Sequence, residues 1–257
     1  MKISNLFEDA FQFSLSSKKK FLGLSGIFMA YIAIIFISTY LFTINQNFLI
    51  LSVGGILAIV LSILADGYGL KTIKESIEGK TEPPELNNWA GMFIGGFKIS
   101  VVGLIYMIIP GLFILASMIP VFNSLINHNV PDFGIGSLIL LLVGMILFVI
   151  YVFISPLIQS NLAYKGFKSA FNIKDILGHL AAYGKVNYFI FVIVLGLILM
   201  CLVFIAVLIR LAFEIFVPFL GQIITALILY PFILLFRSRG IALVYRETLE
   251  LETPEVE

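Results

Sequence analysis

One stretch of the chain decides its fold. Residues 189–209 read FIFVIVLGLILMCLVFIAVLI, and no charged side chain interrupts them. A helix of about 20 apolar residues crosses the hydrocarbon layer of a bilayer, which is about 30 Å thick. The stretch therefore predicts a membrane-spanning helix. Five further windows have the same character, at residues 21–43, 48–65, 99–121, 135–157 and 215–236.

The composition of the whole chain agrees with this interpretation. Apolar residues make up 60% of the 257 residues, charged residues only 12%, and the mean hydropathy is +1.09. Soluble domains are roughly 45–50% apolar and 25% charged, so a single water-soluble core is excluded. The alternating polar positions of a membrane barrel are absent. We predict an all-α integral membrane protein with six transmembrane helices in one domain, residues 1–246.

The basic residues are distributed unevenly. Lys and Arg near the ends of spans stay on the cytoplasmic side. In a six-span arrangement every Lys and Arg except Arg210 falls on one side, which predicts a multi-pass cell membrane protein with both termini in the cytoplasm. The net charge of +1 gives no nucleic-acid footprint, so no nucleic-acid partner is expected. The acidic cytoplasmic tail, residues 247–257, is predicted to be disordered.

Three similar units divide the chain, each with an amphipathic segment, a lysine at the membrane entry and two spans. Lys18, Lys98 and Lys185 mark the three entries. Such repeats are common among transporters, although hydropathy alone can also produce the similarity. Polar residues that open the segments are expected to cap helices. These residues are Asp9, Asn88 and Asp175.

Basic amphipathic segments follow the pairs of spans. In the first, Leu70, Ile73 and Ile77 form an apolar stripe, while Lys71 and Lys74 lie on the polar side. Such helices are expected in the cytoplasmic interface, with their lysines near anionic lipid head groups. Trp89 suits an interfacial anchor, the alternative being an aromatic ligand contact. The candidates for lipid contact are Lys71, Lys74, Trp89, Lys98, Lys165, Lys168 and Lys185.

Several residues in or near the spans disfavour a regular helix. The helix-break candidates are Pro110, Pro218, Gln222 and Pro231. Broken helices expose carbonyl groups to a substrate in transporters, but proline and glycine also serve as packing devices in spans. Both interpretations stay open. Arg210 and Glu214 are four residues apart and are expected to pair on one helix face.

Motifs for catalysis, cofactors or metals are not found. The sequence Gly79-Lys80-Thr81 lacks the earlier glycine of a phosphate-binding loop, because that position is Lys74. The six apolar windows contain no Asp, Glu, Lys or Arg, which argues against proton pumps and intramembrane proteases. We expect no cofactor, metal or catalytic residue. Rim residues for an enzyme that acts on lipid would be Asp66, Gln159, Asn161 and Asp175, and nothing in the sequence brings them together.

The loop after the second window carries a more specific pattern. Residues 67–89 read GYGLKTIKESIEGKTEPPELNNW, and Met92-Phe93-Ile94 and Gly96-Phe97-Lys98 follow. This pattern resembles an uncharacterised, mostly archaeal membrane family, catalogued as domain of unknown function 4013. Pro83-Pro84 stands where the family has leucine-proline. The resemblance implies a membrane protein of an archaeal plasma membrane and carries no catalytic residue.

Two functions follow from the sequence. The first is a non-enzymatic membrane protein that organises lipid or a protein partner at the cytoplasmic face. The second is a permease for an apolar or zwitterionic solute, with the third and sixth spans lining its path. A sealed, dry interior of the bundle would argue against the permease. The sequence does not determine the oligomeric state.

Overall fold

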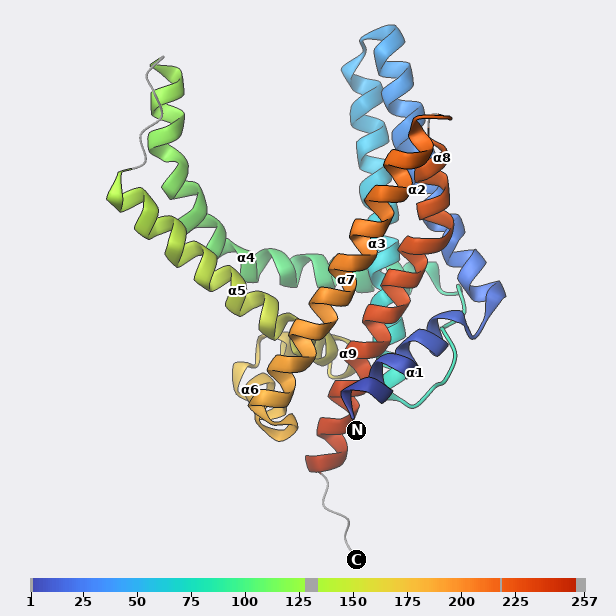
Figure 1. Ribbon diagram of the computed structural model, residues 1–257, viewed down its shortest axis with the longest axis vertical. Coiled ribbons are helices and arrows are strands. Elements are labelled where there is room, and N and C mark those ends of the chain that lie inside the picture. The colour runs from blue at the N-terminus through green and yellow to red at the C-terminus, as the bar shows by residue number, and fades with distance from the viewer. Residues whose placement is uncertain (1, 128–133, 218, 253–257) are drawn as a thin grey trace, which may run out of the picture. The chain divides into compact units, whose positions relative to one another are not determined.

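The computed structural model of the chain describes residues 2–127, 134–217 and 219–252 (Figure 1). Throughout these residues the regular structure is helical, without a strand. The helices in chain order are α1 (Ile3–Leu15), α2 (Lys18–Asn45), α3 (Phe48–Ile77), α4 (Trp89–Ile126), α5 (Ile135–Tyr164), η1 (Phe167–Phe171), α6 (Ile173–Tyr183), α7 (Lys185–Glu214), α8 (Leu220–Ile224), η2 (Thr225–Leu229) and α9 (Tyr230–Glu252).

Six helical stretches in the described part of the chain are long and apolar enough to cross a membrane. They are α2, α3, α4, α5, α7 and the stretch Leu220–Leu251, which combines α8, η2 and most of α9. The predicted all-α fold with six transmembrane helices is confirmed. The helices are longer than the apolar windows, because α3 continues beyond Ala65 and α9 beyond Phe236. Asp66 and Arg237 consequently lie within helices rather than in loops.

The chain divides into two compact units. Unit 1 comprises Met1–Ile99 and Leu157–Glu257, and unit 2 comprises Ser100–Pro156. Unit 2 contains the later part of α4 and the earlier part of α5, where Tyr106 stacks on Tyr151 with ring centroids 5.8 Å apart. A Cβ on Gly144 would lie 2.8 Å from a side-chain carbon of Ile114, so the two helices of unit 2 approach closely.

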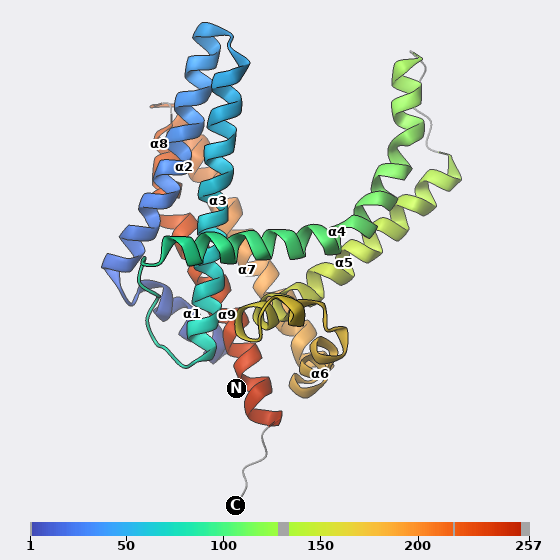
Figure 2. The same cartoon turned by 180° about the vertical axis from the view of Figure 1, so that it is seen from behind.

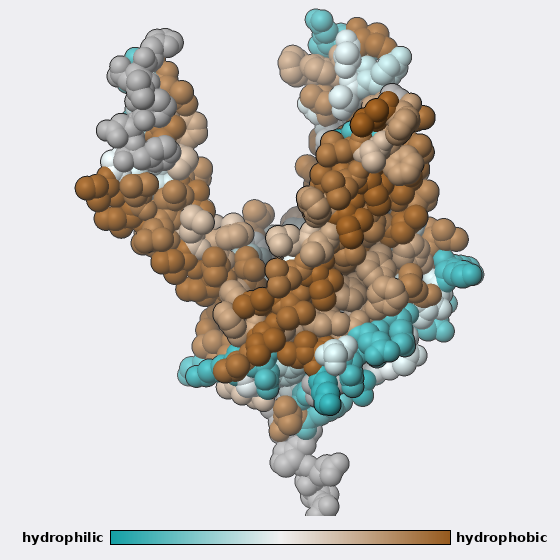
Figure 3. Space-filling model, viewed as in Figure 1, coloured by the Kyte–Doolittle hydropathy of each residue, from teal (hydrophilic) through white to brown (hydrophobic). Residues whose placement is uncertain are grey.

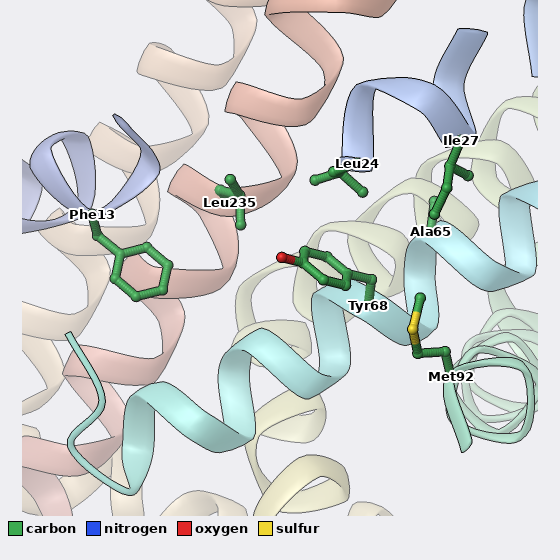
Figure 4. Packing of buried hydrophobic residues seen from close by; sticks show 7 residues of the cluster. All are labelled: Phe13, Leu24, Ile27, Ala65, Tyr68, Met92 and Leu235. Atoms are coloured by element: carbon green, nitrogen blue, oxygen red, sulfur yellow. The ribbon is translucent and has the colours of Figure 1, made fainter. Parts of the chain in front are cut away.

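Unit 1 has a hydrophobic core that joins α1, α2, α3, the start of α4 and α9. Figure 4 shows this cluster, which consists of Phe13, Leu24, Ile27, Ala65, Tyr68, Met92 and Leu235. The buried hydroxyl group of Tyr68 donates a hydrogen bond to the carbonyl oxygen of Pro84 at 2.7 Å. The connection between α3 and α4 is thereby tied to the core. Figure 3 shows hydrophobic side chains along the flank of α7 and hydrophilic side chains gathered at the end of unit 1 that carries α1.

Glycines allow α3 and the start of α4 to cross in close contact (Figure 2). A Cβ on Gly67 would overlap the carbonyl group of Met92, and a Cβ on Gly96 would overlap that of Ile63. Only glycine fits at such a crossing. Gly79 lies just beyond the end of α3, where its φ is +93° and the amide of Lys80 returns to the carbonyl oxygen of Glu75 at 3.0 Å.

The structure corrects two of the three predicted helix caps. Asn88 caps α4, and its Oδ1 accepts a hydrogen bond from the amide of Gly91 at 3.1 Å. Asp9, by contrast, lies in the middle of α1, and the residue that caps α6 is Asn172 rather than Asp175. Both carboxylates instead pair with distant basic side chains. Sequence position alone misled here, because Asp is common at caps but also forms ion pairs.

Arg239 of α9 is the partner of Asp9. Its guanidinium group donates to the carboxylate of Asp9 at 2.6 Å and to the carbonyl oxygen of Lys80 at 2.7 Å. The same group lies 4.7 Å from the ring centre of Phe13. The side chain of Arg239 is only 4% exposed, so α1, α9 and the α3–α4 connection meet at one buried cation.

The acidic tail is ordered further than predicted. Helix α9 continues to Glu252, so the expected disorder is wrong for residues 247–252, while residues 253–257 lie outside the described part. The reason is that Thr248 is buried and its hydroxyl group lies 2.9 Å from Nδ1 of His179 in α6. A tertiary contact therefore extends the helix where composition favours disorder.

Candidate functional site

A large cavity lies in unit 1 and is here called the bundle cavity. Its volume is about 980 Å³, and residues of α2, α3, α7, α8 and α9 line it. The α2 residues on its wall extend from Ile27 to Thr43, a helical rise of about 24 Å. That length is a large part of the roughly 30 Å hydrocarbon layer. The cavity can therefore hold a long molecule.

Most of the cavity wall is apolar. Phe28, Ile32 and Ile35 of α2 face it, together with Leu61 of α3 and Ile233 of α9. Apolar walls with a few polar groups are the usual composition of small-molecule sites in proteins. The polar groups of the bundle cavity therefore determine which molecules fit it.

Two opposite charges share the cavity. Asp66 of α3 and Arg237 of α9 both line it, and the charge of Arg237 acts on Asp66. Asp66 is exposed to the cavity, and its carboxylate forms no hydrogen bond or ion pair with any residue that the structure describes. Arg237 donates one N–H to Oε1 of the buried Gln159 at 2.9 Å. An ionisable side chain within a spanning helix is a candidate functional residue by default.

A second polar group lies at the α7–α8 connection. Nε of Arg210 donates to Oε1 of Glu214 at 2.9 Å, so the predicted pair forms. Nε2 of Gln222 donates to the same oxygen, also at 2.9 Å. Arg210 and Gln222 line the bundle cavity. The cavity consequently has polar groups contributed by α3 and α9 on the one hand, and by α7 and α8 on the other.

The helical wall between Gln222 and Tyr230 is irregular. Phe219 adopts a left-handed conformation with φ +68°, and residues 225–229 form the π-helix η2. Pro231 follows within α9, and its ring lacks the N–H that would bond a preceding carbonyl group. Left-handed non-glycine residues and π-helical turns occur frequently at functional sites. Irregular turns of this kind allow this wall of the bundle cavity to change its conformation.

The helix-break candidates fall in different places. Gln222 faces the bundle cavity, and Pro231 lies in α9 between the cavity-lining residues Tyr230 and Ile233. Pro110 is buried in unit 2, and no described residue of α4 lines the bundle cavity. Pro218 lies outside the described residues.

Two of the candidate lipid-contacting lysines are held by internal partners. Lys71 donates to the carbonyl oxygen of Glu85 at 2.8 Å and to Oδ1 of Asn87 at 2.6 Å. Lys165 binds both carboxylate oxygens of Asp175 at 2.9 Å. These contacts orient the two ammonium groups toward the protein, so lipid would have to compete for them.

The other candidates for lipid contact are more accessible. Lys98, Lys168 and Lys185 are exposed, and Trp89 is 51% exposed. Lys74 is exposed as well and lies 4.0 Å from Glu78, a distance typical of weak surface pairs. Three of the seven candidates share one depression of about 530 Å³. They are Lys71, Lys74 and Lys98.

A buried polar network joins α5, α6 and α9. The hydroxyl group of Tyr245 donates to Oδ1 of Asn161 at 2.6 Å, and Nδ2 of Asn161 donates to Asp175 at 2.9 Å. Burial raises the pKa of Asp175, but its hydrogen bond and charge interaction with Lys165, together with His179 and Asn161, lower that pKa below the ordinary value. Asn161 and His179 are fully buried, so the centre of the network joins the three helices, while Asp175 and Lys165 remain partly exposed at its edge.

The rim residues considered for a lipid enzyme therefore separate into two groups. Asn161 and Asp175 meet in the buried network, whereas Gln159 contacts Arg237, which shares the bundle cavity with Asp66. Among the described residues, no group of three or more His, Cys, Asp or Glu side chains is arranged to hold a metal ion. Arg237 lies one residue beyond an apolar window, so the sequence counted it only among the basic residues that indicate orientation.

The chain matches a known protein family. Residues 50–212 match the family described as proteins of unknown function, DUF4013, and this match covers more than half of the chain. The chain belongs to the DUF4013 family. The resemblance carried by residues 67–89 is thus confirmed. The DUF4013 match includes Asp66 and Arg210 of the bundle cavity and ends before Gln222 and Arg237.

A relative of this DUF4013 protein extends over nearly its full length. An uncharacterised protein of Methanocaldococcus jannaschii is 27% identical over 288 aligned residues, which cover 97% of this chain and 98% of the relative. The relative is archaeal, in agreement with the resemblance. No solved structure matches the chain.

Proposed function

We propose that this DUF4013 protein is a permease that binds a zwitterionic molecule with an apolar body in the bundle cavity. The observation that carries the proposal is Asp66, a carboxylate that is exposed to a large apolar cavity and forms no direct hydrogen bond or ion pair with a described residue, although the charge of Arg237 acts on it. A charge in an apolar environment is costly unless it is paired. A cationic group of the bound molecule would pair with Asp66.

Arg237 extends the recognition to a zwitterion. It lines the same cavity and is close enough for its charge to act on Asp66. A bound molecule with a cationic group at Asp66 and an anionic group toward Arg237 would neutralise both. The apolar walls would then enclose its hydrocarbon portion, since apolar surface buried from water contributes about 25 cal/mol per Å².

The irregular wall supports passage as well as binding. Release of a molecule from a cavity within a membrane requires one wall to move, and transporters commonly use interrupted helices for this purpose. The left-handed Phe219, the π-helix η2 and Pro231 interrupt the helical wall over a short stretch. We assign to this stretch the movement that opens the cavity.

The test is retention of zwitterionic amphiphiles in native mass spectrometry. Protein extracted with its own lipids is expected to retain a zwitterionic amphiphile at about one copy, and the Asp66→Asn variant is expected to lose it. Glu8→Gln is the matched control, because Glu8 lies on α1 outside the cavity and contacts only Gln12 among the described residues. Equal retention by Asp66→Asn and Glu8→Gln would refute the proposal.

A second candidate function is the organisation of lipid or of a protein partner at the cytoplasmic face. The exposed Lys168 and Lys185 support it. Lys71 and Lys165 support it less, because both are held by internal partners. We therefore place it behind the permease.

The location proposed for this multi-pass protein is the cell membrane, with both termini in the cytoplasm. The basis is the position of all Lys and Arg except Arg210 on one side of the six spans. A reporter enzyme that is active only in the cytoplasm, fused after Glu257, is expected to be active. An inactive but folded fusion would indicate that the C-terminus lies on the other side of the membrane.

A further inference from the structure

A second depression in unit 1 combines lysines with apolar side chains and is here called the basic depression. Its volume is about 530 Å³, and it lies on α3, the first turns of α4 and the end of α5. Four lysines and two glutamates line it, which leaves an excess of two positive charges. The lysines are Lys71, Lys74, Lys80 and Lys98. No residue lines both the basic depression and the bundle cavity, so the two sites are independent.

Internal partners occupy two of these four ammonium groups. Lys80 lies 3.0 Å from the carboxylate of Glu75, and Lys71 donates to Glu85 and Asn87 in the α3–α4 connection. A ligand gains little from ammonium groups whose N–H donors are already occupied by close partners.

The other two ammonium groups are available. Lys74 is exposed and reaches Glu78 only at 4.0 Å, a pair whose two side chains are 53% and 43% exposed. Exposed pairs of this kind contribute about 0.2–1 kcal/mol and exchange partners readily. Lys98 is exposed and forms no hydrogen bond or ion pair with any residue of the described part. Lys98 therefore supplies a positive charge without a described partner, and Lys74 supplies one that is held only by a weak exposed pair.

The floor and the apolar edge of the depression give it a defined shape. Gly67 and Gly95 line it at the close crossing of α3 and α4, where side chains larger than hydrogen would fill the space or collide. Leu162 and Phe167 lie on its wall, and Ile94 is 53% exposed. A site with cationic donors on one side and exposed apolar side chains on the other suits an anionic head group with attached hydrocarbon.

We infer that the basic depression binds a phosphate-bearing anion, with Lys74 and Lys98 as its donors. A phospholipid head group and a free phosphate ester share this chemistry. The apolar edge formed by Phe167 and Ile94 favours the lipid, because a free phosphate ester would leave that edge uncovered.

The test compares two double variants of the full-length protein in detergent. Lys74→Gln/Lys98→Gln removes the two available charges, and Lys19→Gln/Lys174→Gln removes two exposed charges outside the depression that are not candidates for lipid contact. Binding of phosphatidylglycerol is measured by native mass spectrometry, with phosphatidylcholine as the reference lipid. The first variant is expected to bind phosphatidylglycerol about 20- to 30-fold more weakly, as for two lysines near an anionic surface. The second is expected to bind it like the wild type.

Competition identifies the source of the phosphate. Displacement of phosphatidylglycerol by millimolar glycerol 3-phosphate would support the phosphate site and assign it to a free ester. Failure to compete, with loss of binding in Lys74→Gln/Lys98→Gln, would support it and assign it to lipid. Equal phosphatidylglycerol binding by the two double variants would overturn the inference. Thermal unfolding of each variant verifies that it is folded.

The experiment is separate from the test of the permease. Asp66→Asn is expected to leave phosphatidylglycerol binding unchanged, and Lys74→Gln/Lys98→Gln to leave the zwitterionic amphiphile in place. Each proposal can therefore fail without the other.

Discussion

The hydroxyl group of Ser25 in α2 donates a hydrogen bond of 2.7 Å to the carbonyl oxygen of Leu227 in η2. Leu227 precedes Pro231 by four residues, and a proline ring has no N–H with which to bond that carbonyl group. Ser25 is 1% exposed, so this hydrogen bond is shielded from bulk solvent. One helix of the bundle thus satisfies the backbone of another at the point where proline interrupts it.

The change Ser25→Ala is expected to leave the carbonyl group of Leu227 without this donor. The free energy of unfolding should fall by about 0.6–1.7 kcal/mol, the average and the maximum measured for interhelical hydrogen bonds within a membrane protein. Unfolding by chemical denaturant in detergent measures the loss. Ser52→Ala is the control, because Ser52 is exposed and bonds within its own helix. An equal loss in both variants would mean that the Ser25–Leu227 bond does not stabilise the bundle.

Arg239→Ala is expected to destabilise unit 1 more than Asp9→Asn. Arg239 is 4% exposed whereas Asp9 is 43% exposed. Removal of the cation leaves both the carboxylate and the carbonyl oxygen of Lys80 without their donor, at a cost of about 3–5 kcal/mol. Asn at position 9 still accepts one hydrogen bond, and we expect a cost of about 1–2 kcal/mol. Denaturant titration measures the free energy of unfolding of both variants. A larger loss in Asp9→Asn than in Arg239→Ala would contradict the role given to the buried cation.

Gly67→Ala is expected to disturb the crossing of α3 and α4. The added Cβ would collide with the carbonyl group of Met92, and overpacking of this kind costs about 1–3 kcal/mol or more. Gly26→Ala is the control, because a Cβ there would meet no atom within 4 Å. The measurement is the thermal unfolding temperature in detergent. If Gly67→Ala unfolds at the temperature of the control, the helices are not in the described contact.

Asp175 is expected to make stability depend on pH in the acidic range. Its folded-state pKa is lowered from the ordinary value of 3.8, so its contribution is fully present above that value. The contribution is lost as the pH falls through the folded-state pKa, because the unfolded chain takes up the proton first. The variant Asp175→Asn should be less stable than the wild type at pH 6, and the difference should shrink below pH 3.8. A difference that stays constant with pH would contradict this account.

Local signals in the sequence predicted much of the fold. The six spans, the cap at Asn88 and the Arg210–Glu214 pair each depend on residues close together in the chain. The ends of the helices were harder to predict from the sequence. A hydropathy window ends at the first charged residue, yet α3 continues through Asp66 because later residues such as Ile73 and Ile77 are buried.

The candidate site depends on contacts that spacing does not reveal. Asp9 and Arg239 are 230 residues apart in the chain, and Asn161 and Tyr245 are 84 apart. The bundle cavity likewise combines Asp66 with Arg237, each of which looks like an ordinary charge at the end of a span. Sequence identified Gln222 as a break in the helix, but its position on the cavity wall follows only from how α8 packs against α7.

The ion pair between Asp9 and Arg239 has a consequence for the order of synthesis. Helix α1 leaves the ribosome before the six spanning stretches, and its partner Arg239 is made only within the sixth of them. Until Arg239 has been made, the carboxylate of Asp9 in α1 has no basic partner. Assembly of unit 1 is therefore completed only when the last helix arrives, and a nascent chain truncated before Arg239 should leave α1 undocked.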